Sequence, residues 1–165
     1  MEKENAIASI VMGRESDLGI MQEAQAVLTR LGVPHESRGI SAHRTPHRAS
    51  KYAQQLEGRG IKLVIAAAGK AAHLAGVPAG MTTLPVIGVP VTTSDLGGLD
   101  SLLSMVQMPG GVPVAPDTLG KAGAKNAAVL AVEILSLTDP ELRKQPGGFR
   151  EEMAREAEQA DIQIG

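Results

Sequence analysis

Three short and almost unbroken apolar runs constrain the fold of this chain more than any other feature of its sequence. They are "AIASIVM" (6–12), "KLVIAAA" (62–68) and "LPVIGVPV" (84–91). Apolar runs of this length, without polar alternation, are typical of strands that are covered on both faces, as in a parallel sheet. We expect a weaker strand at 35–40 and a short fifth strand at 111–115.

Helical patterns separate these runs. The clearest covers 17–32, where Asp17 occupies the expected N-cap position and Gly32 ends the pattern. Its apolar stripe comprises Leu18, Met21, Ala24, Val27, Leu28 and Leu31. Segment 46–60 begins with Pro and ends with Gly, and the Ala-rich segment 122–137 is expected to be well buried. Strands that alternate with helices predict a three-layer α/β/α sandwich around a parallel sheet, flavodoxin-like or Rossmann-like.

Composition excludes several functional classes. The chain has 165 residues, 43% of them hydrophobic, which fits one compact core. It has one Phe, one Tyr and no Trp, so it lacks aromatic platforms for stacking bases, and its net charge of −2 comes without a Lys/Arg run. We therefore expect no nucleic-acid partner. The absence of cysteine excludes disulfides, thiolate metal sites and thiol nucleophiles.

The two ends of the chain differ in character from its middle. The first residues, "MEKENAIASIVM", show no export signal, and no apolar stretch is long enough to span a bilayer, so we expect a cytoplasmic protein without a membrane partner. We divide the chain into a catalytic α/β domain (1–139) and a charged C-terminal helical arm (140–165). In the arm, 145–148 should break the pattern before a helix resumes. One face of that helix carries Phe149, Met153, Ala157 and Ala160. The arm is either a solvated helix with a frayed end or packs on a neighbouring subunit.

Three loops should meet at one edge of the sheet. Ligands of parallel α/β sheets bind outside the carboxyl ends of the strands, near the switch point of the strand order. This rule brings together "GRESD" (13–17), "SAHRTP" (41–46) and "GKAAHLAG" (69–76). The edge is therefore the expected ligand site.

The first loop opens a helix, where free N–H groups and the helix dipole favour an anion. Ser16 can add a hydroxyl donor, Arg14 a bidentate cation, and Asp17 an acceptor for ribose hydroxyls. The competing interpretation is that Ser16 and Asp17 only cap the helix.

The second and third loops add proton-transfer chemistry. Ser41 and Arg44 suit a phosphate, which leaves the His43 imidazole free for proton transfer near neutral pH. Alternatively, Ser41 and Thr45 merely hold a turn while His43 and Arg44 are solvated. Gly69 allows a close backbone approach, and His73 either adds a second imidazole or packs a helix. The histidines lack the spacing of a metal site, so we expect no metal.

Six segments together resemble the 5-(carboxyamino)imidazole ribonucleotide mutase family of purine biosynthesis, once grouped as aminoimidazole ribonucleotide carboxylase. They are "SIVMGRESD", "SAHRTP", "AAGKAAHLAG", "LPVIGVPV", "GLDSLLSMVQMPGGVPVA" and "GAKNAAVLA", and the similarity runs from Ile7 to about Asp139. The resemblance implies a homo-octamer with sites between subunits, a small-molecule ribonucleotide substrate, and no organic cofactor or metal. It also implies the movement of a carboxylate from the exocyclic nitrogen to the ring carbon.

The resemblance also implies roles for particular residues. Ser16, Ser41 and Arg44 would hold the ribonucleotide phosphate, and Asp17 the ribose. His43 would be the general acid and base. The implied catalytic residues are His43 and His73, and the implied substrate-binding residues are Gly13, Ser16, Asp17, Ser41, Ala42, Arg44, Gly69, Lys70, Ala71 and Leu74. Met108 and Pro109 would lie near the entrance.

Three positions depart from the family pattern, which usually has a small hydroxyl residue at Arg14 and glycines at Ala67 and Lys70. In carrying a basic residue at Lys70, the chain resembles related carboxylases that use free carbon dioxide. Those carboxylases lack the His73 imidazole and carry Lys at the position of Arg44. We rank a mutase first, a carboxylase or decarboxylase of the same or a related ribonucleotide second, and a catalytically silent nucleotide-binding relative third.

Overall fold

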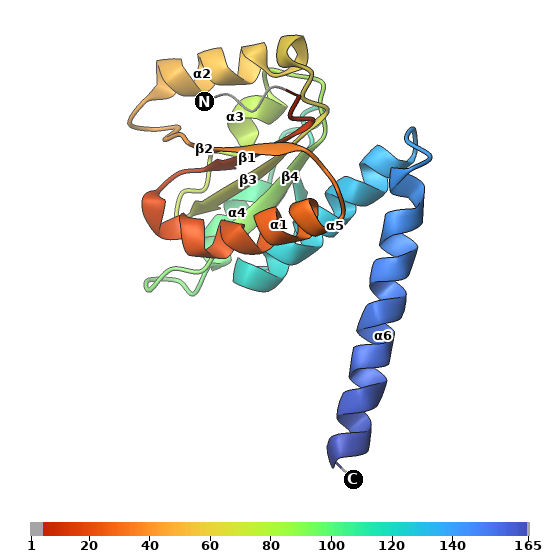
Figure 1. Ribbon diagram of the computed structural model, residues 1–165. Coiled ribbons are helices and arrows are strands. Elements are labelled where there is room, and N and C mark those ends of the chain that lie inside the picture. Colours follow the sequence, from red (N-terminus) through yellow and green to blue (C-terminus); the bar gives the residue numbers. More distant parts are fainter. Residues whose placement is uncertain (1–4, 165) are drawn as a thin grey trace.

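A five-stranded, all-parallel sheet forms the centre of the protein, with the strand order β2-β1-β3-β4-β5 (Figure 1). The computed structural model describes the backbone of residues 5–164 and the side chains of residues 5–160. The strands are β1 (Ala8–Met12), β2 (His35–Gly39), β3 (Leu63–Gly69), β4 (Val86–Val91) and β5 (Ala115–Pro116). The fold is flavodoxin-like, as the alternation of apolar runs and helical patterns predicts.

The fifth strand is shorter and later than predicted. Only Ala115 and Pro116 pair with β4, whereas the sequence indicates a strand at 111–115. The reason lies in the preceding turn, where the Val112 N–H donates to the Pro109 carbonyl at 3.2 Å. Pro113 has no N–H to contribute to a strand ladder. This segment therefore reaches the sheet only at its end.

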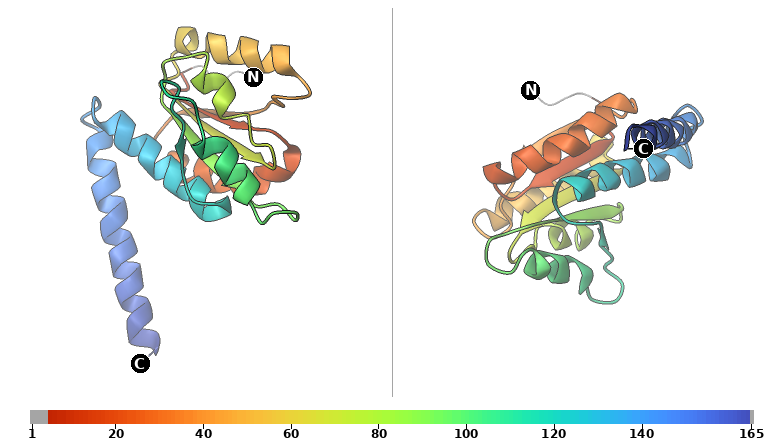
Figure 2. Two further views of the ribbon diagram at one scale, coloured as in Figure 1. Left: turned by 180° about the vertical axis from the view of Figure 1, so that it is seen from behind. Right: turned by 90° about the horizontal axis from the view of Figure 1, so that it is seen from below.

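Helices cover both faces of the sheet (Figure 2). They are α1 (Leu18–Arg30), α2 (Pro46–Gln55), α3 (Gly76–Ala79), α4 (Leu99–Val106), α5 (Gly120–Ser136) and α6 (Gln145–Ile164), with short 3₁₀ turns η1 (Glu15–Asp17), η2 (Glu57–Arg59) and η3 (Leu142–Lys144). α1 and α5 pack on one face, while α2, α3 and α4 pack on the other. No helix in the described part of the chain combines the length and apolarity needed to cross a bilayer.

The two faces of β3 bury alternate residues in two separate cores. Leu63 and Ile65 face α1 and α5, whereas Val64 and Ala66 face the opposite helices. Fully buried alanines line α5, namely Ala124, Ala127, Ala128 and Ala131. Their small side chains bring α5 close to both α1 and the sheet, which confirms the predicted burial of this helix. Of the predicted α1 stripe, Leu18 alone is exposed, at 39%.

The helix α4 has no counterpart among the sequence predictions. It is short, and most of its apolar side chains face outward, whereas its buried residues are Ser101 and Met105. Its exposed apolar side chains, with one residue that precedes the helix, are Leu96, Leu99, Leu103 and Val106. We call these four residues the α4 stripe.

The C-terminal arm begins differently from the prediction. The segment 145–148 does not interrupt the helix but forms the first turn of α6, where Pro146 is well suited. The interruption lies earlier, where Asp139 accepts hydrogen bonds from the Glu141 and Leu142 N–H groups. α6 extends away from the sheet (Figure 1).

Only the start of α6 is attached to the α/β domain. The Phe149 side chain packs against the α1/α5 core and lies 5.0 Å from the Arg30 guanidinium, and the Arg150 guanidinium donates to Glu133 at 2.6 Å. Beyond Met153 every described side chain is exposed, so the predicted apolar face at Ala157 and Ala160 has no partner within the described chain.

Candidate active site

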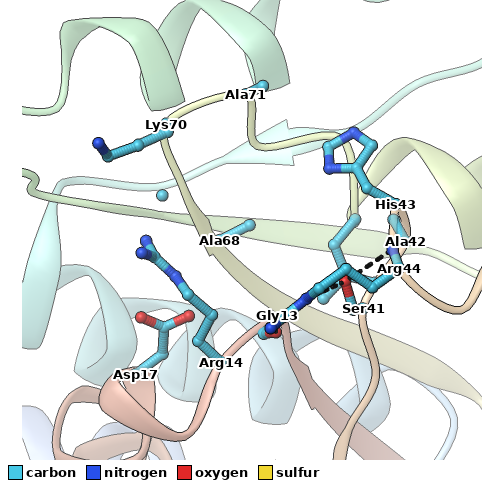
Figure 3. A pocket seen from close by; sticks show the side chains of 12 residues that line it. Gly13, Arg14, Asp17, Ser41, Ala42, His43, Arg44, Ala68, Lys70 and Ala71 are labelled. Carbon is cyan, nitrogen blue, oxygen red and sulfur yellow. Dashed lines mark hydrogen bonds between the residues drawn. The ribbon is translucent and has the colours of Figure 1, made fainter.

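The predicted edge of the sheet carries a pocket of about 300 Å³ (Figure 3). It lies where β1 and β3 end side by side and their following segments diverge, as expected of a switch point. The lining residues are Gly13, Arg14, Asp17, Ser41, Ala42, His43, Arg44, Ala68, Gly69, Lys70, Ala71 and Leu74. The expectation that three loops share this edge is confirmed.

The turn that follows β2 is closed by hydrogen bonds to Ser41. The Ser41 Oγ accepts from the Arg44 backbone N–H at 3.1 Å and from Arg44 Nε at 3.3 Å, while its carbonyl accepts from Thr45. Arg44 Nη2 also donates to the Gly13 carbonyl at 3.3 Å, which links the first two loops. Because Ser41 Oγ acts as an acceptor in both bonds, its own proton remains available to an anion.

His43 and His73 form a hydrogen-bonded imidazole pair. His43 Nε2 lies 2.7 Å from His73 Nδ1, and the ring planes meet at 76°. One nitrogen must donate and the other accept, so the pair holds a proton between its members. His43 lines the pocket whereas His73 does not, which makes His73 a candidate positioning residue for His43.

Asp17 is the buried charge of the site. The residue is only 2% exposed, its Oδ1 accepts from the Ser16 hydroxyl at 3.3 Å, and its Oδ2 has no hydrogen-bond partner. Burial raises the pKa of Asp17, although the nearby Arg14 charge and the Ser16 hydrogen bond oppose this effect. Asp17 occupies the N-cap position of α1 but makes no side-chain capping bond, and it faces the pocket instead. Ser16 is exposed and does not line the pocket.

The third loop approaches the first at Gly69. A Cβ atom at Gly69 would lie 2.8 Å from Thr93 Cγ2 and 2.9 Å from an Arg14 guanidinium nitrogen, so a side chain there would displace both. Arg14 thus lies between this loop and Asp17 (Figure 3). The position needs glycine because the backbone itself forms this wall.

Lys70 adopts a left-handed conformation, with φ of 58°, and its ammonium forms an ion pair with Asp95. Both side chains are about half exposed. Hydrogen bonds from Lys70 and Ser94, together with the Lys70 charge, lower the pKa of Asp95. Sequence reasoning missed Thr93 and Asp95. Their position directly after β4, at the same edge of the sheet, is the signal that would have found them.

Some residues that the sequence predicts for the site fall outside the pocket lining. Ser16 and His73 contact lining residues but do not line the pocket, whereas Ala68, which was not predicted, does. Met108 lies near Gly76, because a Cβ there would meet its thioether at 3.5 Å, but Met108 is also outside the lining. Among the described residues, no three His, Asp or Glu side chains gather as metal ligands would.

The fold and the pocket together define a doubly wound parallel α/β protein whose switch point carries a cation-lined cavity beside an imidazole pair. The chain belongs to the AIR carboxylase family, whose sequence model matches residues 7–156.

Similar proteins support this assignment. The chain is 50% identical over 159 residues to the N5-carboxyaminoimidazole ribonucleotide mutase of Pyrococcus horikoshii, covering 96% of this chain and 89% of that protein. It is 53% identical over 145 residues to the mutase of the same name from Bacillus subtilis, covering 88% and 90%. The crystal structure of Treponema denticola PurE superimposes with a TM-score of 0.85 at 28% identity, covering 95% of this chain and 97% of that one.

The raised pKa of Asp17 predicts that its ionised carboxylate, which lines the pocket, lowers the free energy of unfolding. A raised folded-state pKa means that ionised Asp17 opposes folding above its ordinary pKa of 3.8. Asp17→Asn should therefore stabilise the ligand-free protein at pH 7 by about 1 kcal/mol, or about 2–4 °C in Tm. The gain should shrink as the pH falls through the folded-state pKa, because wild-type Asp17 then becomes neutral. Thermal unfolding across pH measures this difference.

Glu15→Gln is the matched control, since Glu15 is exposed in the same 3₁₀ turn. It should leave Tm unchanged. A lower Tm for Asp17→Asn at pH 7 would show that the carboxylate supports the fold.

Proposed function

We propose that this chain is an N5-carboxyaminoimidazole ribonucleotide mutase, which moves a carboxylate from the exocyclic nitrogen of the ribonucleotide to its ring carbon. The observation that carries the proposal is His43. It combines a hydrogen bond to a second imidazole with a place in the turn of Ser41 and Arg44, on the wall of the pocket. The names of the relatives support the same reaction.

Anion recognition comes from the turn at 41–45. Arg44 offers a guanidinium, Ser41 offers its free hydroxyl proton, and both belong to a turn whose geometry is fixed before a ligand arrives. These groups suit the phosphate of a ribonucleotide. Asp17 Oδ2, buried without a hydrogen-bond partner, suits a ribose hydroxyl, because a donor there would relieve the cost of its burial.

The reaction needs one proton to enter and one to leave. A proton delivered to the exocyclic nitrogen breaks its bond to the carboxylate and releases carbon dioxide. The ring carbon then attacks carbon dioxide, and loss of the ring proton restores the aromatic imidazole. His43 is the candidate for both transfers, since the imidazole that gives the first proton is then free to take the second. His73, 2.7 Å away, orients the His43 ring.

The proposed function is tested by supplying aminoimidazole ribonucleotide and its two carboxylated forms separately, with and without bicarbonate. A mutase interconverts the carboxylated forms without bicarbonate. A carboxylase or decarboxylase links only the ring-carboxylated form to the uncarboxylated one. Absence of turnover under all conditions would leave a nucleotide-binding relative.

His43→Asn should abolish this interconversion while ribonucleotide binding stays within about tenfold, or about 1.4 kcal/mol. His47→Asn is the matched control, because His47 lies in the same region of the chain but does not line the pocket. Turnover of His43→Asn at the wild-type rate would remove His43 from the reaction.

Lys70 supports the carboxylase alternative, because its side chain adds a cation to the pocket lining. Its ion pair with Asp95 means that this charge is partly neutralised before substrate binds. We propose that Lys70 attracts the carboxylate of the substrate and that Asp95 limits this attraction.

Two substitutions test the role of Lys70 in opposite directions. Lys70→Gln should weaken binding of both carboxylated forms, relative to the uncarboxylated ribonucleotide, by about tenfold. Asp95→Asn should strengthen binding of both carboxylated forms, because it removes the counter-charge of the Lys70 ammonium and keeps the ammonium itself. Lys70→Gly also removes the charge, but it relieves the backbone as well, since glycine accepts the left-handed φ without strain. Comparison with Lys70→Gln therefore distinguishes an effect of the charge from an effect of the backbone conformation. Equal substrate preference in all three variants would make Lys70 a solvated side chain.

We further propose that the protein is a homo-octamer in which sites lie between subunits and the arm packs on a neighbour. The exposed α4 stripe and the unpartnered end of α6 support self-association.

Light scattering should give a mass about eight times the 17.1 kDa of the chain. Leu103→Glu places a charge in the α4 stripe and should reduce that mass, whereas Leu103→Met keeps the face apolar and should not. A wild-type monomer at micromolar concentration would contradict the proposal.

A further inference from the structure

A second and larger pocket, of about 410 Å³, lies beside α2. Its lining residues come from α2, from η2 and from the end of β2, and β2 is an edge strand of the sheet (Figure 1). Its lining residues are Arg38, Ile40, His47, Arg48, Lys51, Tyr52, Gln55 and Arg59. None of them lines the candidate active site, so the two pockets are separate.

A buried carboxylate organises the floor of this pocket. Glu36 Oε1 accepts from the Tyr52 hydroxyl at 2.5 Å, while its Oε2 accepts from the Arg59 guanidinium and, at 3.3 Å, from Arg38. The Tyr52 oxygen in turn lies 2.6 Å from Ser9 Oγ. Burial raises the pKa of Glu36, but the hydrogen bonds from Arg59 and Tyr52 outweigh it and the pKa is lowered. Glu36 therefore stays ionised, and the two arginines are held in place before any ligand arrives.

The rim of the pocket adds basic side chains that have no counter-charge. Arg48 and Lys51 are exposed on the same face of α2, three residues apart, and within the described chain neither has an ion-pair partner. Like charges at this spacing repel one another along a helix. The arginines of the floor, Arg38 and Arg59, both pair with Glu36. The rim cations Arg48 and Lys51 are therefore the groups that an anion would meet first.

The arrangement of the cationic side chains indicates which chemical class of ligand fits the pocket. The Arg59 guanidinium lies 5.4 Å from the centre of the Tyr52 ring and covers one of its faces, and the Tyr52 hydroxyl is bound to Glu36, so the pocket offers no open platform for a base. Guanidinium groups bind phosphate oxygens through paired hydrogen bonds, and Lys51 adds a point charge one turn along the rim. The pocket has a volume of about 410 Å³ and cations on both its floor and its rim, so a chain of linked phosphates can contact more of them than a single phosphate can.

We propose that this pocket binds a polyphosphate anion, either an inorganic di- or triphosphate or the phosphate chain of a nucleotide, through its phosphates alone. The floor arginines Arg38 and Arg59 hold one end of the anion, and Arg48 and Lys51 hold the other. This inference does not depend on the proposed reaction, because it concerns residues outside the candidate active site.

Calorimetric titration of the full chain with inorganic triphosphate tests the proposal. Arg48→Gln/Lys51→Gln should weaken binding by about tenfold or more, or about 1.4 kcal/mol. Lys121→Gln/Lys125→Gln removes the same charge from α5, where both lysines pair with Glu23, and should leave the affinity unchanged. Arg44→Gln removes the guanidinium assigned to phosphate binding in the candidate active site, and triphosphate binding to the second pocket should persist in this variant with the same affinity. Orthophosphate should bind this pocket at least about tenfold more weakly than triphosphate.

A nucleoside triphosphate distinguishes the two sources of the anion. Equal affinity for inorganic triphosphate and adenosine triphosphate is the expected result, since only phosphates are recognised. Triphosphate binding that is lost in Arg44→Gln, or unchanged in Arg48→Gln/Lys51→Gln, would overturn the proposal.

Folding and assembly are checked on the same samples. The Arg48→Gln/Lys51→Gln variant should keep the wild-type Tm or exceed it, because it removes a repulsion between exposed side chains. Lys51→Glu, a single exposed change, should weaken triphosphate binding further than Lys51→Gln. A change in the assembly mass of the double variant would show that this face is an interface between copies of the chain, and would also overturn the proposal.

Discussion

The pairing of β1 with β2 on one side and β3 on the other is the constraint on which the rest of the structure depends. It aligns Met12 with both Gly39 and Ala67, so β1 and β2 end at the same level and β3 continues beyond them to Gly69. The connection through α1 crosses one face of the sheet, and the connection through α2 crosses the other. The chain therefore diverges beyond β1 and β3, and the space left between the diverging loops is the candidate active site. Both faces of these strands are buried, which fixes the register and hence the alignment of the loops.

The site concentrates groups whose bonding capacity the protein itself does not use. Asp17 Oδ2 is buried without a partner, the Ser41 proton is free, and Lys70 is held at a positive φ. Such features oppose folding, and the surrounding cores offset them. In the second pocket, by contrast, both carboxylate oxygens of Glu36 accept hydrogen bonds from the protein. The positive charges on its rim are the groups without an ion-pair partner among the described residues. The two pockets share no lining residue.

Much of the fold could be predicted from the sequence, because apolar runs and helix-ending glycines report local physics directly. The runs at 6–12 and 84–91 each contain an observed strand, and the run at 62–68 covers all of β3 except its last residue, Gly69. The failures have one cause in common, since they depend on contacts that a local pattern does not contain. α4 is short and carries its apolar side chains on the outer side, and the first turn of α6 contains two glycines that look like a break. In the site, the loops were found by topology, but the Asp95 partner of Lys70 lies 25 residues away and follows a different strand.

The central proposal is that the product keeps the carboxylate of the substrate and does not take one from dissolved carbon dioxide. The direct measurement starts from N5-carboxyaminoimidazole ribonucleotide labelled with carbon-13 in its carboxylate, in a solution of unlabelled bicarbonate, and follows the label during turnover by mass spectrometry. The account predicts that the ring-carboxylated product keeps the label. A product whose carboxylate comes from the unlabelled pool would contradict the account and assign the chain to carboxylation by free carbon dioxide.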